Sequence, residues 1–199
     1  MGLGVRGFMR IGAAIAGCAL VAACTPDQPP TVTPTPTPTA TPSPTPSATP
    51  TETDIERRMR LDFEAAEKTY RANVLEQDRQ AKLGIAVSTP VLRQTSTGEY
   101  LKFSLSGLRD IEKSGWRAVG KVKIVGIARG GWKAKRLKLI ACEDGSGIKL
   151  IDKSNRDVTP KVSRMFIQNY TVVKIGSLWK LAELQSKRVR SFEGVSCGI

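Results

Sequence analysis

The residue type that most limits the chemistry of this chain is one that it lacks, because none of its 199 residues is histidine. Without histidine there is no Ser-His-Asp or Cys-His nucleophilic centre, no histidine-ligated zinc or haem, and no histidine pH switch. General acid–base chemistry would then depend on carboxylates and tyrosines with shifted pKa values. Each candidate falls where a solvated helix or strand face is the ordinary explanation, so we expect neither enzymatic activity nor a cofactor. The candidates are Glu99, Tyr100, Asp110, Glu112 and Tyr170.

Two other patterns could hold a ligand. Glu143-Asp144-Gly145 carries carboxylates but lacks the one-residue spacing of a calcium loop, so a plain turn is expected and no metal site is predicted. Aromatic residues could line a small-molecule pocket, although tryptophans more often form the core between a sheet and its helices. The candidate pocket residues are Tyr100, Trp116, Trp132, Tyr170 and Trp179.

Residues 1–23 have the composition of a bacterial lipoprotein signal peptide. Arg6 and Arg10 form a short basic region, and the apolar run that follows carries no charge. This run is too short to span ~30 Å of hydrocarbon as a helix, which takes about 20 residues, but it suits the apolar core of a secretory signal. It ends in Val21-Ala22-Ala23-Cys24, which resembles the lipobox of bacterial lipoproteins.

The lipobox resemblance implies that Cys24 is diacylated and becomes the first residue of the mature chain. Ile15-Ala16-Gly17-Cys18 fits the same pattern, but cleavage there would leave a very short apolar region. An ordinary secreted protein, cleaved nearby and left with a free cysteine, is the other alternative. Two or three acyl chains give a stable anchor, at about 0.8 kcal/mol per buried methylene. We therefore expect a lipid-anchored protein on the extracytoplasmic face of the cell membrane.

Residues 24–53 follow as a spacer made almost entirely of Thr, Pro, Ser and Ala. Proline at every second position, as in Thr33-Pro34-Thr35-Pro36, removes backbone donors and fixes φ, so neither helix nor sheet is expected. Such a disordered stalk is extended, and at ~3.1 Å per residue it could hold the next domain up to about 90 Å from the bilayer. Its composition also suits O-glycosylation.

Residues 54–199 are expected to form one folded domain that begins with a long helix. Thr53-Asp54-Ile55-Glu56 is a capping box, and Gly84 is the predicted stop. A second helix is predicted over residues 99–113, although Gly107 inside it weakens the pattern. Apolar residues recur at helical spacing along the first helix, and they are Ile55, Met59, Phe63, Ala66, Tyr70 and Val74.

Beyond Trp116 the pattern changes to strands, with a turn predicted at Arg129-Gly130-Gly131. The last two strands should form a hairpin over Gly176-Ser177, where glycine in the first central position suits a type II′ turn. Helices followed by strands predict an α+β fold, in which N-terminal helices pack on a curved antiparallel sheet of four to five strands. The expected strands are 119–128, 132–142, 148–152, 165–175 and 178–189.

This order of elements resembles the cone-shaped nuclear transport factor 2-like fold, and the cystatin-like fold shares the same plan. More narrowly, residues 54–199 resemble Gram-positive, actinobacterial-type envelope lipoproteins of that fold, whose function is mostly unassigned. The resemblance is carried by Cys142-Glu143-Asp144-Gly145-Ser146 at the end of a strand, Gly176-Ser177-Leu178-Trp179-Lys180 in the last hairpin, and Cys197. It implies a cone-like α+β domain.

Cys142 and Cys197 are the cysteines that the expected mature domain retains. An even pair in an oxidising compartment is typical of a disulfide. It would close a loop of about 55 residues and contribute on the order of 4 kcal/mol in the chain-entropy picture. A buried free Cys142 and an intermolecular bridge through Cys197 are the alternatives.

The chain has 31 basic and 18 acidic residues, a formal net charge of +13, which favours anionic partners without choosing among them. Lys121 and Lys123 alternate on one predicted sheet face, and Lys133 and Lys135 are expected to repeat this on the next strand. Anionic lipid, a wall polymer or an envelope protein would suit such a surface, as would solvent alone. Nucleic acid is not expected, because no aromatic residues interleave the basic stretches. The candidate anionic-surface contacts are Lys121, Lys123, Lys133, Lys135, Lys187, Arg188 and Arg190.

Together these patterns predict a lipid-anchored envelope protein that presents a non-catalytic binding or assembly module. The first alternative is a small-molecule carrier or enzyme that uses the mouth of the cone, which a deep pocket with an ordered polar group would favour. The second is a scaffold component of a secretion or conjugation machine, which crosslinking to machine subunits would support. Scaffolds of that kind usually hang from a transmembrane helix.

Overall fold

The computed structural model describes residues 52–195 and residue 197. The predicted signal peptide, Cys24 and all but the last residues of the stalk lie outside the described residues. Within that described range, no helix combines the length and the apolar character needed to cross a membrane.

The two predicted helices are confirmed as α1 (Asp54–Leu83) and α3 (Gly98–Lys113). The capping box is present: the Thr53 hydroxyl accepts from the Glu56 amide at 3.2 Å, and the Glu56 carboxylate accepts from the Thr53 amide at 2.8 Å. α1 ends at Gly84, whose φ of 64° is the left-handed conformation that glycine adopts readily. A short helix that the sequence pattern did not predict, α2 (Pro90–Thr95), lies between them.

The α1 face predicted to be apolar is only partly buried. Phe63, Ala66 and Tyr70 are buried, whereas Ile55 is 69% and Met59 37% exposed. Further along the helix, the buried positions are polar, and each of these side chains has hydrogen-bond partners. They are Asn73, Glu76 and Gln80.

The strands confirm the predicted α+β class. β2 (Lys123–Lys133), β3 (Arg136–Asp144), β5 (Met165–Ile175) and β6 (Leu178–Val189) form a curved antiparallel sheet in the order β2-β3-β5-β6. β1 (Arg117–Val119) and β4 (Lys149–Ile151) pair in a second, smaller sheet. The β5–β6 hairpin turns over Gly176-Ser177 as predicted, with Ile175 opposite Leu178 and a φ of 60° at Gly176.

The predicted turn at Arg129-Gly130-Gly131 is wrong. β2 continues through these residues with a register shift between Arg129 and Trp132, and the chain reverses after Lys133. A Cβ at Gly130 would clash with Lys138 on the adjacent strand, so the glycine permits close strand approach at a bulge rather than a turn. The predicted strand 119–128 divides into β1 and β2 near Gly120, whose φ is 96°.

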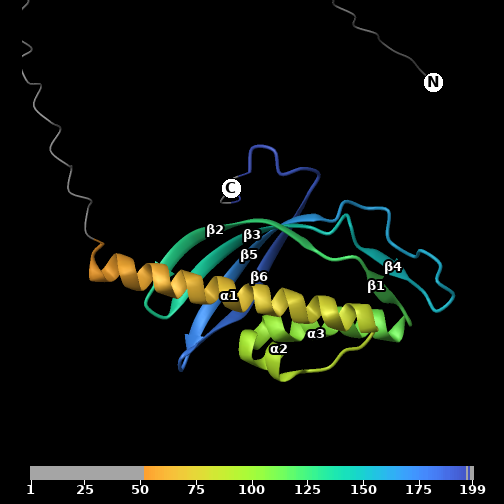
Figure 1. Ribbon diagram of the computed structural model, residues 1–199, viewed down its shortest axis with the longest axis horizontal. Helices are drawn as coiled ribbons and strands as arrows, with labels where there is room; N and C mark the ends of the chain where they lie inside the picture. Colours follow the sequence, from red (N-terminus) through yellow and green to blue (C-terminus); the bar gives the residue numbers. More distant parts are fainter. Residues whose placement is uncertain (1–51, 196, 198–199) are drawn as a thin grey trace, which may run out of the picture. The chain divides into compact units, whose positions relative to one another are not determined.

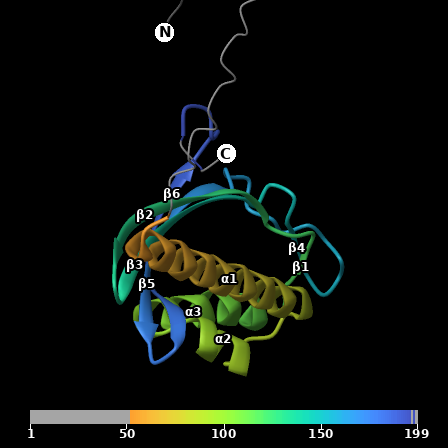
Figure 2. The ribbon, with the colours of Figure 1, turned by 60° about the vertical axis from the view of Figure 1, so that its left-hand side comes forward.

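The helices lie on one side of the sheet. Figures 1 and 2 show α1 crossing the strands, with α3 beside it and the β1–β4 pair near the C-terminal end of α1. α2 and α3 are joined by a small cluster of Leu92, Leu105 and Leu108. The main core fills the space between helices and sheet and consists of Phe63, Ala66, Tyr70, Tyr100, Leu137, Leu139, Ala141, Tyr170, Val172, Trp179 and Leu181.

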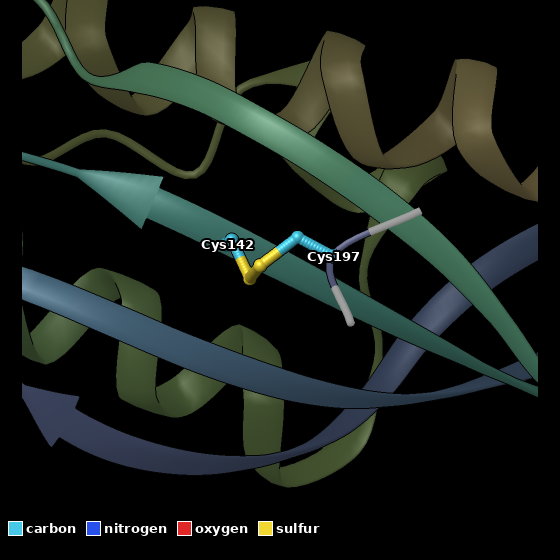
Figure 3. The surroundings of a disulfide bond; sticks show 2 residues. All are labelled: Cys142 and Cys197. Atoms are coloured by element: carbon cyan, nitrogen blue, oxygen red, sulfur yellow. A yellow bond between two sulfur atoms is a disulfide. The ribbon is translucent and has the colours of Figure 1, made fainter. Parts of the chain in front are cut away.

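Cys142 and Cys197 form an intramolecular disulfide across a sequence separation of 55, with their Cα atoms 5.8 Å apart. Cys142 lies on β3 and points away from the helices (Figure 3), as expected because its neighbours Ala141 and Glu143 face them. Cys197 therefore lies on the outer face of the sheet. Gly126 on β2 allows this, since a Cβ there would collide with the Cys197 carbonyl.

Candidate functional site

A cavity of about 400 Å³ lies between the helices and the sheet. Its size is typical of sites for small organic molecules. α1 and α3 form one wall, and the ends of β3 and β5, with the segment around β4, form the other. The apolar and aromatic residues that line it are Val74, Ala81, Tyr100, Phe103, Leu108, Ile111, Ala118, Val122, Ile148, Leu150, Pro160, Phe166, Tyr170 and Leu184.

One face of α3 provides most of the helical wall. Positions 100, 103, 104, 107, 108 and 111 all line the cavity, at the spacing that places residues on one side of a helix. Phe103 is 62% exposed, and Gly107 is also exposed, so they mark the side on which the cavity meets solvent.

Gly107 widens the cavity. Glycine in the middle of a helix destabilises it by roughly 0.5–1 kcal/mol relative to alanine, and Gly107 has no close packing that requires it. A Cβ placed there would meet no atom within 4 Å. The missing side chain therefore leaves open space where the cavity meets solvent.

Glu143 is the buried charged group in this cavity wall. It lies on β3, is 9% exposed, and lines the cavity. Its Oε1 accepts hydrogen bonds from the hydroxyls of Tyr70 at 2.7 Å and Tyr170 at 2.9 Å, and its Oε2 accepts one from Gln168 Nε2 at 3.3 Å. All three donors are neutral. Among residues 52–195 and 197, no Lys or Arg nitrogen lies within 4.0 Å of the Glu143 carboxylate.

Burial and the charge on Glu143 keep the neighbouring phenols protonated. Burial is the largest cause that raises the pKa of Tyr70, followed by the Glu143 charge. The pKa of Tyr170 is raised well above its ordinary value, again by burial first and then by Tyr100 and Glu143. Both hydroxyls thus remain hydrogen-bond donors over the physiological pH range.

The third tyrosine of the chain completes an aromatic cluster around the carboxylate. The Tyr170 ring lies 5.1 Å from that of Tyr70 and 5.5 Å from that of Tyr100, with the second pair edge to face. The Tyr100 hydroxyl donates to Asn73 Oδ1 at 3.0 Å and accepts from Gln77 Nε2 at 3.1 Å. Burial raises the pKa of Tyr100 as well.

Gln168 has unused hydrogen-bonding capacity beside the cavity. Its Nε2 faces Glu143, which fixes the orientation of the amide, because the reverse orientation would oppose two acceptors. Its Oε1 is buried and has no hydrogen-bond partner among the described residues. Buried acceptors normally have a partner, so this atom marks an incompletely satisfied site.

The structure separates the candidate pocket residues. Tyr100 and Tyr170 line the cavity, but the tryptophans do not. Trp179 is 4% exposed and packs in the core, and Trp132 is half-buried, with its Nε1 donating to Asp62 at 3.1 Å. Trp116 is half-buried at the end of α3, and its carbonyl approaches Gly84.

The carboxylates considered for acid–base chemistry lie apart from Tyr100 and Tyr170. Glu99, Asp110 and Glu112 are all exposed on α3 and do not line the cavity. Glu99 pairs with Lys102 at 2.8 Å, and Glu112 accepts from the Ala86 amide at 3.3 Å. Within the described residues, no group of three or more metal-ligating side chains comes together.

The basic residues divide between opposite ends of the sheet. In the strand register, Lys123 of β2 lies at the same end of the sheet as Asp144 of β3, Met165 of β5 and Val189 of β6. Lys187, Arg188 and Arg190 therefore lie at that end as well. Lys133 ends β2 at the opposite end, followed by Lys135 in the turn. The prediction that these two repeat the Lys121–Lys123 pattern on the next strand is therefore wrong. All seven candidate contacts are exposed.

Sequence patterns alone place Glu143 in a turn and Tyr70 on the apolar face of the first helix, and they give Gln168 no part in a site. Strand alternation could have identified Glu143. Residues 137, 139, 141 and 143 lie on the face of β3 opposite to Cys142, so alternation places the Glu143 carboxylate on the buried face of the strand. Only the tertiary structure brings Tyr70 on α1 and Tyr170 on β5 to that carboxylate.

Comparison with known proteins gives structural likenesses only. No known family profile matches the chain, and no curated protein matches it. The chain is similar to the intermembrane space region of the chloroplast protein ARC6, with a TM-score of 0.41 and 14% identity over 60% of this chain and 95% of that chain. It is also similar to a domain of unknown function with a cystatin-like fold from Nostoc punctiforme, with a TM-score of 0.39 and 16% identity over 67% of this chain and 81% of that chain.

Proposed function

We propose that this protein is a lipid-anchored, extracytoplasmic binding protein that holds an apolar small molecule in the cavity between α3 and the sheet. The cavity is the observation that carries the binding role. Its lining is mostly apolar and aromatic, with a few polar groups such as Glu143 and Gln168. Apolar walls with a few fixed polar groups are the usual composition of small-molecule sites.

The proposal favours the carrier alternative over the non-catalytic assembly module that the sequence first suggested. A deep pocket with an ordered polar group was the discriminating feature, and the cavity with the hydrogen-bonded Glu143 supports the carrier on that criterion. Retention at the membrane rests on the lipobox ending in Cys24, and the Thr/Pro spacer would hold the domain away from the bilayer.

The tether is tested by expressing the full chain in a bacterium that processes lipoproteins, followed by cell fractionation and intact-mass measurement. We expect the wild-type chain in the membrane fraction to begin at Cys24 and to carry a diacyl mass there, and the Cys24→Ala chain to lack that mass. Cys18→Ala is the matched control and should stay membrane-bound. Loss of the diacyl mass in Cys18→Ala, or its persistence in Cys24→Ala, would contradict the assignment.

The binding role is tested on the expected mature chain, residues 24–199 with Cys24→Ala, which lacks both the acyl chains and the apolar run of the predicted signal peptide. We expect the neutral probe naphthylethanol to bind with a stoichiometry of one in isothermal titration calorimetry. Absence of saturable binding would contradict the carrier role. A probe of this size is well within a cavity of about 400 Å³.

A further inference from the structure

Glu143 is buried in an apolar wall without a cation to balance it. A carboxylate taken out of water loses several kcal/mol of solvation, which proteins normally offset with a paired charge as well as hydrogen bonds. Here the phenols of Tyr70 and Tyr170 and the Gln168 amide provide hydrogen bonds, but no described Lys or Arg nitrogen comes within 4.0 Å.

Glu143 is nonetheless one of the residues that line the cavity. A ligand in the cavity therefore lies next to Glu143, whose carboxylate accepts hydrogen bonds from three neutral donors and has no positively charged partner within 4.0 Å among the described residues. A protonated amine on that ligand would provide both the missing charge and further donors. Hydrogen bonds between charged groups are about twice as strong as those between neutral ones.

Aromatic residues in the lining suit the same ligand. Tyr100, Phe103 and Tyr170 line the cavity, as does Phe166, whose ring already has the Arg188 guanidinium 5.5 Å from its centroid. The negative faces of aromatic rings attract organic cations, and aromatic cages are the common means of binding ammonium groups in proteins. The remaining cavity surface is apolar, which would hold a hydrocarbon or aromatic body.

The other charged groups in the lining are already engaged. Asp78 pairs with Lys82 at 2.6 Å. Arg164 donates through its guanidinium to the backbone carbonyls of Ile148 and Ser146 in the loop before β4. Arg164 is also only partly buried, so solvent screens its charge more than that of Glu143.

We propose that the cavity is selective for apolar molecules that carry one protonated amine, with the ammonium group bound by Glu143 and the aromatic residues around it. This inference rests on the proposed binding role and assigns its ligand class. Glu143 is then the specificity-determining residue, and the apolar walls contribute the remainder of the affinity.

The test compares probes that share a ring system and differ in charge: naphthylethylamine, naphthylethanol and naphthylacetate. Each is titrated calorimetrically against the same mature Cys24→Ala chain at about 0.15 M salt, where exposed charges farther apart than about 8 Å are largely screened. We expect the amine to bind about 10- to 100-fold more tightly than the alcohol, since a hydrogen bond to a charged group contributes about 1.5–3 kcal/mol.

Glu143→Gln should remove the preference for the amine, so that the amine and the alcohol bind this variant with affinities within about twofold of each other. This substitution is not expected to disturb the fold, because the oxygen of the new side-chain amide can still accept from Tyr70 and Tyr170. The nitrogen of the new amide can donate to the unpartnered Gln168 Oε1 once the Gln168 amide turns over. Asp144→Asn is the matched control, because Asp144 is the next residue, has the same charge, and does not line the cavity.

The possible outcomes separate this inference from the binding role. Equal affinities for amine and alcohol in the wild-type chain would overturn the ligand class and leave the binding role intact. Tighter binding of the carboxylate probe would also overturn it and would indicate Arg164 as the recognition group. Loss of the amine preference in Asp144→Asn would assign it to net charge rather than to Glu143. Failure of all three probes to bind would overturn both proposals.

Discussion

Replacement of Gly107 by phenylalanine should close the cavity without weakening the fold. The glycine has room for a Cβ, since no atom lies within 4 Å of that position. The helix gains from losing a glycine, by roughly 0.5–1 kcal/mol for alanine and a few tenths for phenylalanine. The new ring would lie against the apolar residues of the cavity wall, so we expect the free energy of unfolding to stay constant or rise.

The effect on ligand binding should be large. A phenylalanine that displaces a ligand from about 100 Å² of apolar wall removes roughly 2.5 kcal/mol at ~25 cal/mol per Å². This corresponds to an increase in Kd of about 50- to 100-fold. Gly107→Ala provides the control, because it gives the helix-propensity gain and fills little of the space.

Two measurements on each variant check this reasoning: urea unfolding followed by circular dichroism, and calorimetric titration with naphthylethanol. We expect Gly107→Phe to unfold at the same or a higher urea concentration than the wild-type chain and to lose probe binding, and Gly107→Ala to keep it. A loss of stability in Gly107→Phe would refute the open space at this position. Unchanged probe binding in a folded Gly107→Phe chain would refute the cavity as the binding site.

Four further predictions concern stability and protection from proteolysis. Glu143→Ala should lower the free energy of unfolding by about 2–4 kcal/mol in urea denaturation, because two buried tyrosine hydroxyls lose their acceptor. Glu143→Gln should leave the free energy of unfolding unchanged, and an equal loss in both variants would contradict this explanation. Reduction of the Cys142–Cys197 disulfide should lower it by about 4 kcal/mol, measured with and without reductant, whereas an unchanged midpoint would contradict the stabilising role of the bond. Gly126→Ala should expose the C-terminal segment to carboxypeptidase, since the added Cβ collides with the Cys197 carbonyl, and wild-type digestion rates would contradict that clash. The side-chain hydrogen bond from Arg79, with those from Gln80 and Thr89, lowers the pKa of Glu76 from 4.5 to about 2. The stability that the ionised carboxylate adds is fully present above pH 4.5 and is lost as pH falls through about 2, so the urea midpoints of wild type and Glu76→Gln should converge as pH falls over that range. A gap as large at pH 2 as at pH 6 would contradict this.

Local patterns in the sequence predicted those parts of the fold that short-range interactions decide. The capping box and Gly84 fixed both ends of α1, and the two-residue turn fixed the β5–β6 hairpin. The bulge in β2 was mistaken for a turn because a Gly-Gly pair is compatible with either, and the choice depends on the neighbouring strand at Lys138. α2 was missed because six residues are too few to establish a helical period.

The candidate site was less accessible to sequence reasoning than the fold. Tyr100 and Tyr170 were selected as pocket residues, but the tryptophans that were grouped with them pack elsewhere. Glu143 could be placed on the inner face of β3 from alternation alone. Its partners come from sequence separations of 73 and 27 residues, however, and no local pattern reports such contacts.

The central claim, that a small molecule occupies the space between α3 and the sheet, is tested most directly by crystallography with a bromine-labelled naphthylethylamine. Our account predicts a single anomalous bromine peak in the cavity lined by Leu108, Phe166 and Tyr170, with the ammonium nitrogen within hydrogen-bond distance of the Glu143 carboxylate. A cavity filled by its own side chains, with the bromine peak absent or elsewhere on the protein, would contradict it.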